Sequence, residues 1–397
     1  IASMQCFCLY EMIMKNEMRM NTSKSIRTVF AGFAAFLLLG FLLFPLQGCN
    51  SEPSLKAAKG DEEVIYVVAD SLEWESMRVA FEQVFERIVI TPQAEKLFQL
   101  VRVNYSDMNN YKMMKNIIIT APFQSQSKVG KYLREVFDSA ATVSVLEGKV
   151  TNVNKRDVWA ANQMVMFITA TDEQQLEYSV LRNGDNLVYA FQKISDERVS
   201  KSLYSSKFGN IKDQAKLYRD YGFNLFVQVD YYLATNKPED NFVWLRRAKD
   251  SNFERWVFIH WIDNASPDYL NRDSILTIRN RATGRYYRAA DNVNYVTLQS
   301  DSLATVQEFN FNGKYALMTQ GLWKMTDEFM GGPFLSYTFY DAKSKRLYMI
   351  DGSIFAPGHF KRNLIQQIDI LLKSFRLNHE IDAETRKQLE EELGKQS

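Results

Sequence analysis

The chain has 397 residues, and 46% of them are hydrophobic and 13% aromatic, which is typical of a packed globular protein and excludes a disordered one. Its 48 basic and 47 acidic residues leave a net charge of +1, so the composition gives no support for nucleic-acid binding. The length allows one large domain or two modest ones.

The first distinctive segment is an export signal that ends at Cys49. Lys24 and Arg27 precede the apolar run Val29–Leu46, and the sequence Leu-Gln-Gly-Cys closes it. This pattern predicts a lipoprotein signal peptide, with Cys49 as the lipid-modified residue. An uncleaved membrane helix is the alternative, because the run is close to the lower limit for a span. Since several acyl chains anchor stably, we expect a lipid-anchored protein of the cell envelope, on the outer membrane facing the periplasm.

The domain organisation follows from this signal. Residues 1–48 are expected to be a spurious N-terminal extension plus the signal peptide, because Met20 offers an ordinary start. Residues 49–63 are expected to be the lipidated cysteine and a flexible polar tether. Then follow a globular domain, 64–378, for which a division into sub-lobes 64–150 and 156–378 is an open alternative, and a charged C-terminal helix, 379–397.

The first half of the globular part predicts strands that alternate with helices. Apolar runs predict strands at 64–69, 97–105, 115–121 and 163–170, and the third favours the centre of a sheet. Helical spacing of apolar residues predicts helices at 77–88 and 129–137. Thr171 is expected to cap a long amphipathic segment that breaks at 183–185, and 148–157 is expected to be a polar joint.

The second half predicts more strands. A helix over 211–221 is expected to end at Gly222, and the alternation of apolar residues from Phe223 to Leu233 predicts a half-buried strand. Pro357 is expected to open a last core helix. Its apolar stripe comprises Phe360, Leu364, Ile365, Ile368, Leu371, Leu372 and Phe375. Other strands are expected at 242–245, 256–262, 306–311, 315–323, 334–341 and 347–351, and a helix at 267–280.

These elements indicate an α+β fold of mixed sheets with packed helices. The order strand, helix, strand, strand, helix fits 64–137 and again 163–280. An internal duplication is therefore an open alternative.

Several strings of residues are distinctive together. They are Asp157–Trp159, Asp240–Arg247, Phe309–Tyr315, Gly321–Trp323, Phe329–Phe334, Ala356-Pro357 and Lys361-Arg362. Together they resemble the Bacteroidota envelope lipoprotein family catalogued as domain of unknown function 4837, over about Val64 to Phe375. The resemblance implies an envelope lipoprotein of that phylum. The family has no known activity, so the resemblance implies no catalytic residues.

The familiar signatures of catalysis are absent from the sequence, including the nucleophile elbow, the phosphate-binding glycine loop and His-Glu-x-x-His. His260 with Asp263 could supply part of a triad, but His260 lies in an apolar strand, which favours a satisfied core or sheet-face histidine. With three scattered histidines and no Cys-x-x-Cys pair, we expect no metal and no cofactor. No residue is assigned as catalytic.

The most unusual local feature is Gly331-Gly332-Pro333, which follows Trp323 closely. Because glycine allows a close backbone approach, these four residues form a candidate binding surface. The alternative is a tight turn before the next strand, with Trp323 in the core. Arg246-Arg247 and Lys361-Arg362 are candidates for binding anionic groups, or else solvated charges.

The favoured function is a non-catalytic binding or scaffolding lipoprotein. It would attach to the membrane through its N-terminal lipid and bind an envelope protein or a glycan. The alternative is an envelope hydrolase that acts on glycan, peptide or lipid, with an acid pair that the sequence does not locate.

Overall fold

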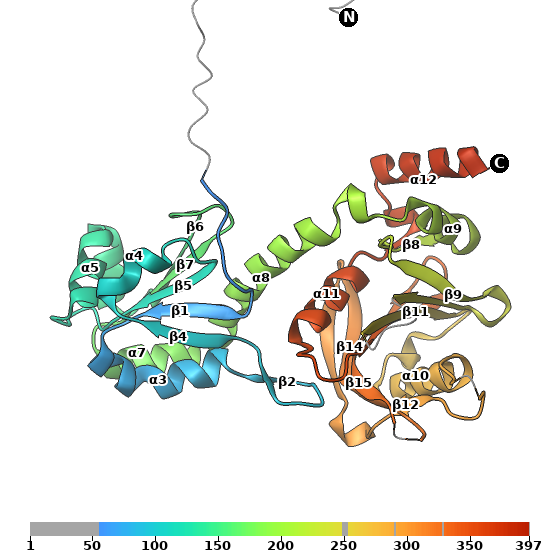
Figure 1. Cartoon of the computed structure of the whole chain (residues 1–397), viewed down its shortest axis with the longest axis horizontal. Helices are drawn as coiled ribbons and strands as arrows, with labels where there is room; N and C mark the ends of the chain where they lie inside the picture. Colours follow the sequence, from blue (N-terminus) through green and yellow to red (C-terminus); the bar gives the residue numbers. More distant parts are fainter. Residues whose placement is uncertain (1–54, 248–252, 290, 328, 397) are drawn as a thin grey trace, which may run out of the picture. The chain divides into compact units, whose positions relative to one another are not determined.

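The computed structural model describes residues 55–396 except 248–252, 290 and 328, and it confirms an α+β fold (Figure 1). Within these residues no helix combines the length and the hydrophobicity that a membrane crossing requires. Cys49 and the expected signal peptide lie outside the described residues. The last part of the expected tether is ordered, since Ala58 N donates to Ala161 O at 3.0 Å and Lys59 N to Met113 O at 2.7 Å.

The first lobe, residues 55–204, is built on a five-stranded sheet in the order β4-β1-β5-β7-β6. Four strands are parallel and β6 is antiparallel at the edge. The wholly buried β5 lies in the middle, as its apolar sequence predicted. The strands are β1 Val64–Val68, β4 Gln99–Val103, β5 Asn116–Thr120, β6 Asn152–Arg156 and β7 Met164–Ile168.

Helices cover both faces of this sheet (Figure 1). One face shares a core with α3 Ser71–Phe85, α7 Glu173–Arg182 and α8 Gly184–Leu203. The other packs against α4 Met108–Tyr111, α5 Lys128–Val136 and α6 Ser139–Leu146. A short hairpin, β2 Ile88–Val89 and β3 Glu95–Lys96, leaves the end of α3.

The second lobe, residues 205–396, is built on an antiparallel sheet in the order β12-β14-β15-β16-β11-β10-β9, with β13 also paired to β14. Its strands are β9 Tyr231–Lys237, β10 Phe242–Arg247, β11 Glu254–Ile262, β12 Val296–Leu298, β13 Thr305–Phe311, β14 Lys314–Met325, β15 Gly331–Asp341 and β16 Arg346–Phe355. A separate pair, β8 Phe223–Asn224 and β17 Arg376–Leu377, closes one end.

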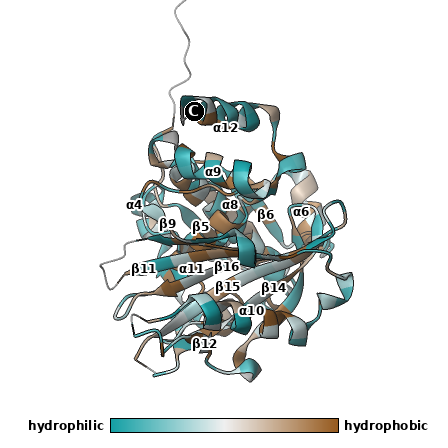
Figure 2. Ribbon diagram, turned by 90° about the vertical axis from the view of Figure 1, so that its right-hand side faces the viewer, coloured by the Kyte–Doolittle hydropathy of each residue, from teal (hydrophilic) through white to brown (hydrophobic). Residues whose placement is uncertain are grey.

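Helices also cover both faces of the second sheet. One core includes α9 Ile211–Tyr221 and α11 Arg362–Leu372, and the other includes α10 Arg272–Tyr286. The terminal helix α12 Ala383–Gln396 is largely hydrophilic (Figure 2), and Leu389 buries itself against Ala215 of α9. Short 3-10 turns lie at Tyr105–Asp107, Ser206–Phe208, Pro238–Asp240, Pro267–Tyr269, Asp301–Leu303 and Asn378–Glu380.

Three predictions about element boundaries are wrong. The expected strand Phe223–Leu233 ends after β8, because backbone groups beyond it form hydrogen bonds outside the sheet. Phe226 N, for example, donates to Ser374 Oγ at 3.0 Å. The last helix begins at Arg362 and not at Pro357, and Phe360 is 80% exposed. Asp172, and not Thr171, caps α7, since its carboxylate accepts from Gln175 N at 2.9 Å.

The expected division at residues 150–156 is also wrong, because 152–156 form edge strand β6 of the first sheet. Their polar residues suit an edge that solvent reaches. The lobes divide instead after α8. The two sheets differ in topology, one mainly parallel and one antiparallel, so the structure contradicts an internal duplication.

Candidate functional site

The surface predicted around Trp323 is not exposed. Trp323 has 0% exposure and its ring centroid lies 5.0 Å from that of Trp256. A Cβ built on Gly332 would lie 2.0 Å from Ile354 O, so this glycine admits the neighbouring strand β16 and not a ligand. Gly331 begins β15, and Pro333 is buried within it. The expectation of an exposed binding surface there is therefore wrong, because the sheet's own packing fills the space.

His260 is a half-buried histidine on the sheet face of β11, which fits the expectation of a structural histidine in an apolar strand. Its Nδ1 lies 2.9 Å from Asn241 O, and burial lowers its pKa. Asp263 binds Arg346 at 2.6 Å and Asn241 Nδ2 at 2.8 Å. The described part of the chain holds no group of three His, Cys, Asp or Glu side chains that could bind a metal ion.

A cavity of about 460 Å³ lies where the two lobes meet, and we call it the junction cavity. Helices α8 and α11 contribute polar walls, hairpin β2–β3 and its loop an aliphatic wall, and strands β13 to β15 the floor. The cavity is lined by Arg87, Ile88, Val89, Ile90, Leu97, Gln192, Asp196, Thr305, Gln307, Met318, Gln320, Phe334, Leu335, Arg362, Ile365, Gln366 and Asp369.

Two carboxyl groups in this cavity have different environments. Burial raises the pKa of Asp196, and the neighbouring Asp369 raises it further, although a hydrogen bond from Gln366 opposes the change. Asp369 accepts from Tyr337 Oη at 2.5 Å and from Lys373 Nζ at 2.7 Å, so it is paired with a cation. The cavity thus holds one carboxyl whose pKa burial raises and one carboxyl that is paired with a lysine.

Arg362 orients the amide beside Asp196. Its Nη1 donates to Gln366 Oε1 at 3.1 Å, which leaves the Gln366 amide nitrogen to donate to Asp196 Oδ1 at 2.7 Å and to Ser195 Oγ at 2.9 Å. Its Nε donates to Leu97 O at 2.9 Å in the first lobe. Burial lowers the pKa of Arg362. This network holds α8 and α11 together at the back of the cavity.

Glu95 fixes the hairpin wall. This buried carboxylate accepts from Lys361 N at 2.8 and 2.7 Å and from Arg362 N at 2.7 Å, so it caps α11 from the first lobe. The first backbone N–H groups of a helix have no partner inside the helix, and an anion there also interacts favourably with the helix dipole. The hairpin is thereby tied to the floor and walls of the second lobe.

Three glutamine side chains of the cavity are available to a ligand. Gln192, Gln307 and Gln320 have no side-chain hydrogen bond to another described residue and line the cavity from α8, β13 and β14. Two strand edges are also close by. Within the described residues, β2 pairs with β3 alone and β13 with β14 alone.

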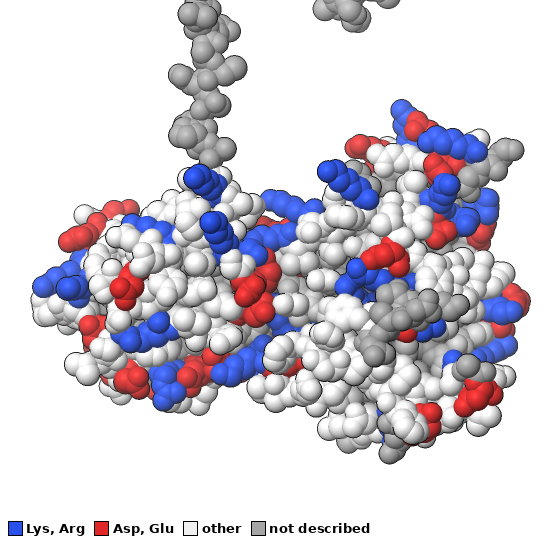
Figure 3. All heavy atoms as spheres, in the orientation of Figure 1, with Lys and Arg blue, Asp and Glu red and all other residues white. Residues whose placement is uncertain are grey.

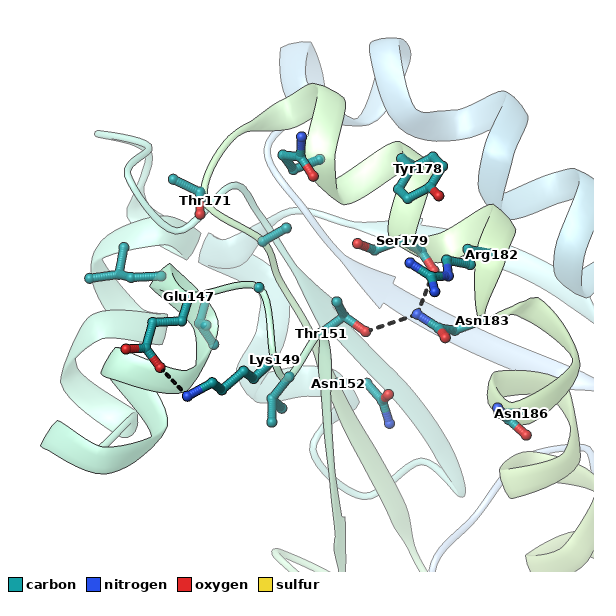
Figure 4. Close-up of a pocket in the computed structure, with 16 residues that line it drawn as sticks. Glu147, Lys149, Thr151, Asn152, Thr171, Tyr178, Ser179, Arg182, Asn183 and Asn186 are labelled. Carbon is teal, nitrogen blue, oxygen red and sulfur yellow. Dashed lines mark hydrogen bonds and ion pairs between the residues drawn. The ribbon is translucent and has the colours of Figure 1, made fainter.

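A second hollow lies on the first lobe between α7 and the chain that leads into β6 (Figure 4). It measures about 670 Å³, and part of its polar lining is paired: Glu147 binds Lys149 at 2.7 Å, and Asn183 Nδ2 donates to Thr151 Oγ1 at 3.3 Å. Tyr178 is 57% exposed at its rim. This groove also offers the amides of Gln175 and Asn186, the guanidinium of Arg182 and one exposed ring, and all of its lining belongs to the first lobe.

Sequence reasoning missed the residues of the junction cavity. Asp196 and Asp369 are 173 positions apart and come together only through the packing of α8 on α11. A signal for Asp369 existed, because this carboxylate interrupts the apolar sequence between Ile368 and Ile370. Asp196 and the glutamines have no comparable signal.

Comparisons with known proteins divide the chain at the same place as the structure. Residues 209–374 match the family model described as Domain of unknown function (DUF4837), which supports the resemblance for the second lobe. Residues 58–204 match a different model, Domain of unknown function (DUF8532), so the expected extension of the first family back to Val64 needs correction. A search of curated proteins found no match to the chain. Each lobe is therefore similar to its own family of unknown function.

Proposed function

We propose that this protein is a lipid-anchored envelope lipoprotein whose junction cavity binds an extended segment of another envelope protein. The run from Lys24 to Cys49 supports the anchor, because it has the charge, the apolar length and the cysteine that lipidation requires. The observation that carries the binding role is the set of free amides and a protonatable carboxyl in a cavity between two lobes. Its volume falls within the range of about 300–1,000 Å³ that is common for ligand sites.

The chemistry of the cavity favours a peptide. A peptide group presents one donor and one acceptor, and each of the side chains Gln192, Gln307 and Gln320 offers both. Aliphatic lining residues that are not fully buried, such as Ile88, Val89 and Ile365, suit apolar side chains of the guest. The adjoining edges of β2 and β13 offer main-chain pairing, a common mode of peptide recognition.

A glycan fits this cavity less well. Sugar rings bind well against the exposed face of an aromatic ring, whereas Phe334, the aromatic residue of the lining, is itself buried. Tyr178 in the groove of Figure 4 offers an exposed ring instead. We would therefore expect a glycan to bind at the groove around Tyr178 and a peptide to bind in the junction cavity, so an experiment that locates the ligand distinguishes the two.

The carboxyl pair supports a second candidate function, a hydrolase. A carboxyl with a raised pKa beside a second carboxyl that is paired with a cation is an arrangement that can divide the roles of general acid and general base. Asp196 would be the acid and Asp369 the base. In this case the bound peptide would be cleaved and not merely held.

Selection from a library of random peptides, using the protein from Ser51 onward, tests the proposal. All five core clusters lie within residues 55–396, so this protein retains the whole core. We expect enriched peptides with alternating apolar residues, and weaker binding by at least about tenfold, or 1.4 kcal/mol, in Gln307→Trp, which fills the cavity. The matched control is Glu308→Trp, an exposed neighbour that does not line the cavity.

Three outcomes would contradict the peptide-binding proposal: no enriched peptide, equal binding by Gln307→Trp and wild type, or binding of an oligosaccharide alone. Cleavage of the selected peptide, lost in Asp196→Asn while binding persists, would establish the hydrolase in place of the binding protein.

A further inference from the structure

A separate cavity at the lobe junction is strongly basic. It measures about 690 Å³, and its lining includes five cations and one carboxylate, Glu62. The cations are Lys115, Arg198, Lys201, Arg247 and Arg255. Figure 3 shows Lys and Arg side chains around the middle of the molecule, alongside α8. We call this the basic cavity.

Three of the cations have anionic partners. Glu62 binds both Lys115 at 2.9 Å and Arg198 at 3.0 Å, so one carboxylate serves two charges. Arg247 pairs with Asp230. Among the residues that the structure describes, these contacts neutralise part of the cavity and leave an excess of positive charge.

Arg255 and Lys201 hydrogen-bond to neutral amides. Arg255 donates to Gln367, and its Nε has no hydrogen-bond partner within the part of the chain that the structure describes. Lys201 Nζ donates to Asn162 Oδ1 at 3.1 Å, while the nearest acidic residue of its helix, Glu197, is already held by Arg156 at 2.6 Å. Arg255 is only 6% exposed, so its charge is buried without a full counter-charge.

The sheet register adds to this imbalance. Arg247 and Arg255 lie directly opposite each other on β10 and β11. Like charges at directly opposed positions of an antiparallel pair are destabilising. Burial lowers the pKa of Arg255, and the charge of Arg247 lowers it further. An anion in the basic cavity would remove this repulsion and complete the hydrogen bonding of Arg255.

We infer that the basic cavity binds a phosphate group. Arginine presents several N–H donors in a plane that matches the oxygens of phosphate, and Lys201 supplies a further charge at the rim. The phosphate could belong to a soluble compound or to the headgroup of an anionic phospholipid. Ala57 and Ala58 line the cavity and follow Cys49 by eight and nine residues, a reach of at most about 30 Å. The lipid source depends on the proposed anchor, whereas phosphate binding does not.

Two probes and two variants test the inference, again with the protein from Ser51 onward. Calorimetry with inorganic phosphate measures the soluble source. Sedimentation with vesicles of phosphatidylcholine, alone or mixed with phosphatidylglycerol, measures the lipid source at low salt. We expect Arg255→Gln to weaken binding of at least one probe by about tenfold. The control Arg219→Gln, on α9 away from the cavity and paired with Asp220, should bind as the wild type does.

The two sources give different results. Phosphate that binds in solution and displaces the vesicles indicates a site that free phosphate compounds can fill. Binding to anionic vesicles alone, lost in Arg255→Gln, indicates a headgroup site. If Arg255→Gln fails to fold, Lys201→Gln at the rim replaces it. The inference is overturned if neither probe binds the wild type, or if Arg255→Gln, or Lys201→Gln in its place, binds as well as Arg219→Gln does. Because the peptide test uses another cavity, either proposal can fail alone.

Discussion

Glu95 provides a quantitative test of how the two lobes are joined. Its carboxylate, 4% exposed, caps the first turn of α11 through Lys361 N and Arg362 N. Glu95→Ala would leave both N–H groups buried and without a partner. A hydrogen bond to a charged group contributes about 1.5–3 kcal/mol, so two of them set an upper bound of about 6 kcal/mol. Loss of a helix cap costs about 0.5–2 kcal/mol. We therefore expect Glu95→Ala to lower the free energy of unfolding by about 3 kcal/mol.

Urea denaturation followed by tryptophan fluorescence measures the loss of stability, and hydrogen exchange at Lys361 and Arg362 locates it. Glu95→Gln is the matched control, because it keeps one acceptor oxygen and removes the charge, so its loss should be smaller than that of Glu95→Ala. A loss below about 1 kcal/mol in Glu95→Ala, with unchanged exchange at the two amides, would refute the reasoning. It would mean that α11 does not depend on a cap from the first lobe.

Four further predictions concern single side chains. Because burial raises the pKa of Asp196, the folded protein holds a proton that the unfolded chain releases, so stability falls as the pH rises above about 4. Asp196→Asn should therefore gain stability relative to wild type between about pH 4 and pH 7, and an identical difference in urea midpoint at both pH values would contradict this. Arg279 is wholly buried and lies 2.7 Å from Asp351, so Arg279→Met should lower the free energy of unfolding by about 3–5 kcal/mol. Adding Asp351→Leu should recover most of that loss, because it removes the unpaired buried carboxylate. Calorimetric melting measures both variants, and a double variant less stable than the single one would contradict this prediction. Leu364→Asp should lower the melting temperature strongly, because Leu364 lies on the face of α11 that packs into the core. An unchanged melting temperature would show that this face of α11 is not packed. Cys49→Ser should abolish lipid attachment and leave the leader in place, whereas mass spectrometry that finds no acyl mass on the wild type would rule the anchor out.

Local patterns were enough to predict several elements. The apolar run at 115–121 predicted β5 at the centre of its sheet, and Gly222, with a positive φ of 74°, ends α9 as expected. The prediction of a buried apolar stripe on α11 is confirmed except at Phe360, which is exposed, and α11 begins at Arg362 and not at Pro357. In these segments the sequence itself contains the interaction that decides the structure.

The errors occur where a distant residue decides the structure. The alternating apolar residues after Phe223 reach the core, but their backbone does not pair as a strand. Phe226 N, for example, donates a hydrogen bond to the side chain of Ser374. The start of α11 depends on Glu95, which lies 266 residues before Lys361. The junction cavity depends likewise on the packing of α8 against α11, which a periodicity argument does not contain. Trp323 was misplaced because an apolar aromatic residue beside two glycines fits a buried sheet as well as an open surface.

Hydrogen exchange with and without a selected peptide is the most direct test of the central claim, because it reports where the peptide lies. We predict slower exchange in three segments that meet at the junction cavity: the middle of α8 around Gln192 and Asp196, strand β13 at Thr305–Gln307, and the first two turns of α11. Exchange in the groove around Tyr178 should stay unchanged. Protection confined to that groove or to the basic cavity, or no change in the three segments at saturating peptide, would contradict the account.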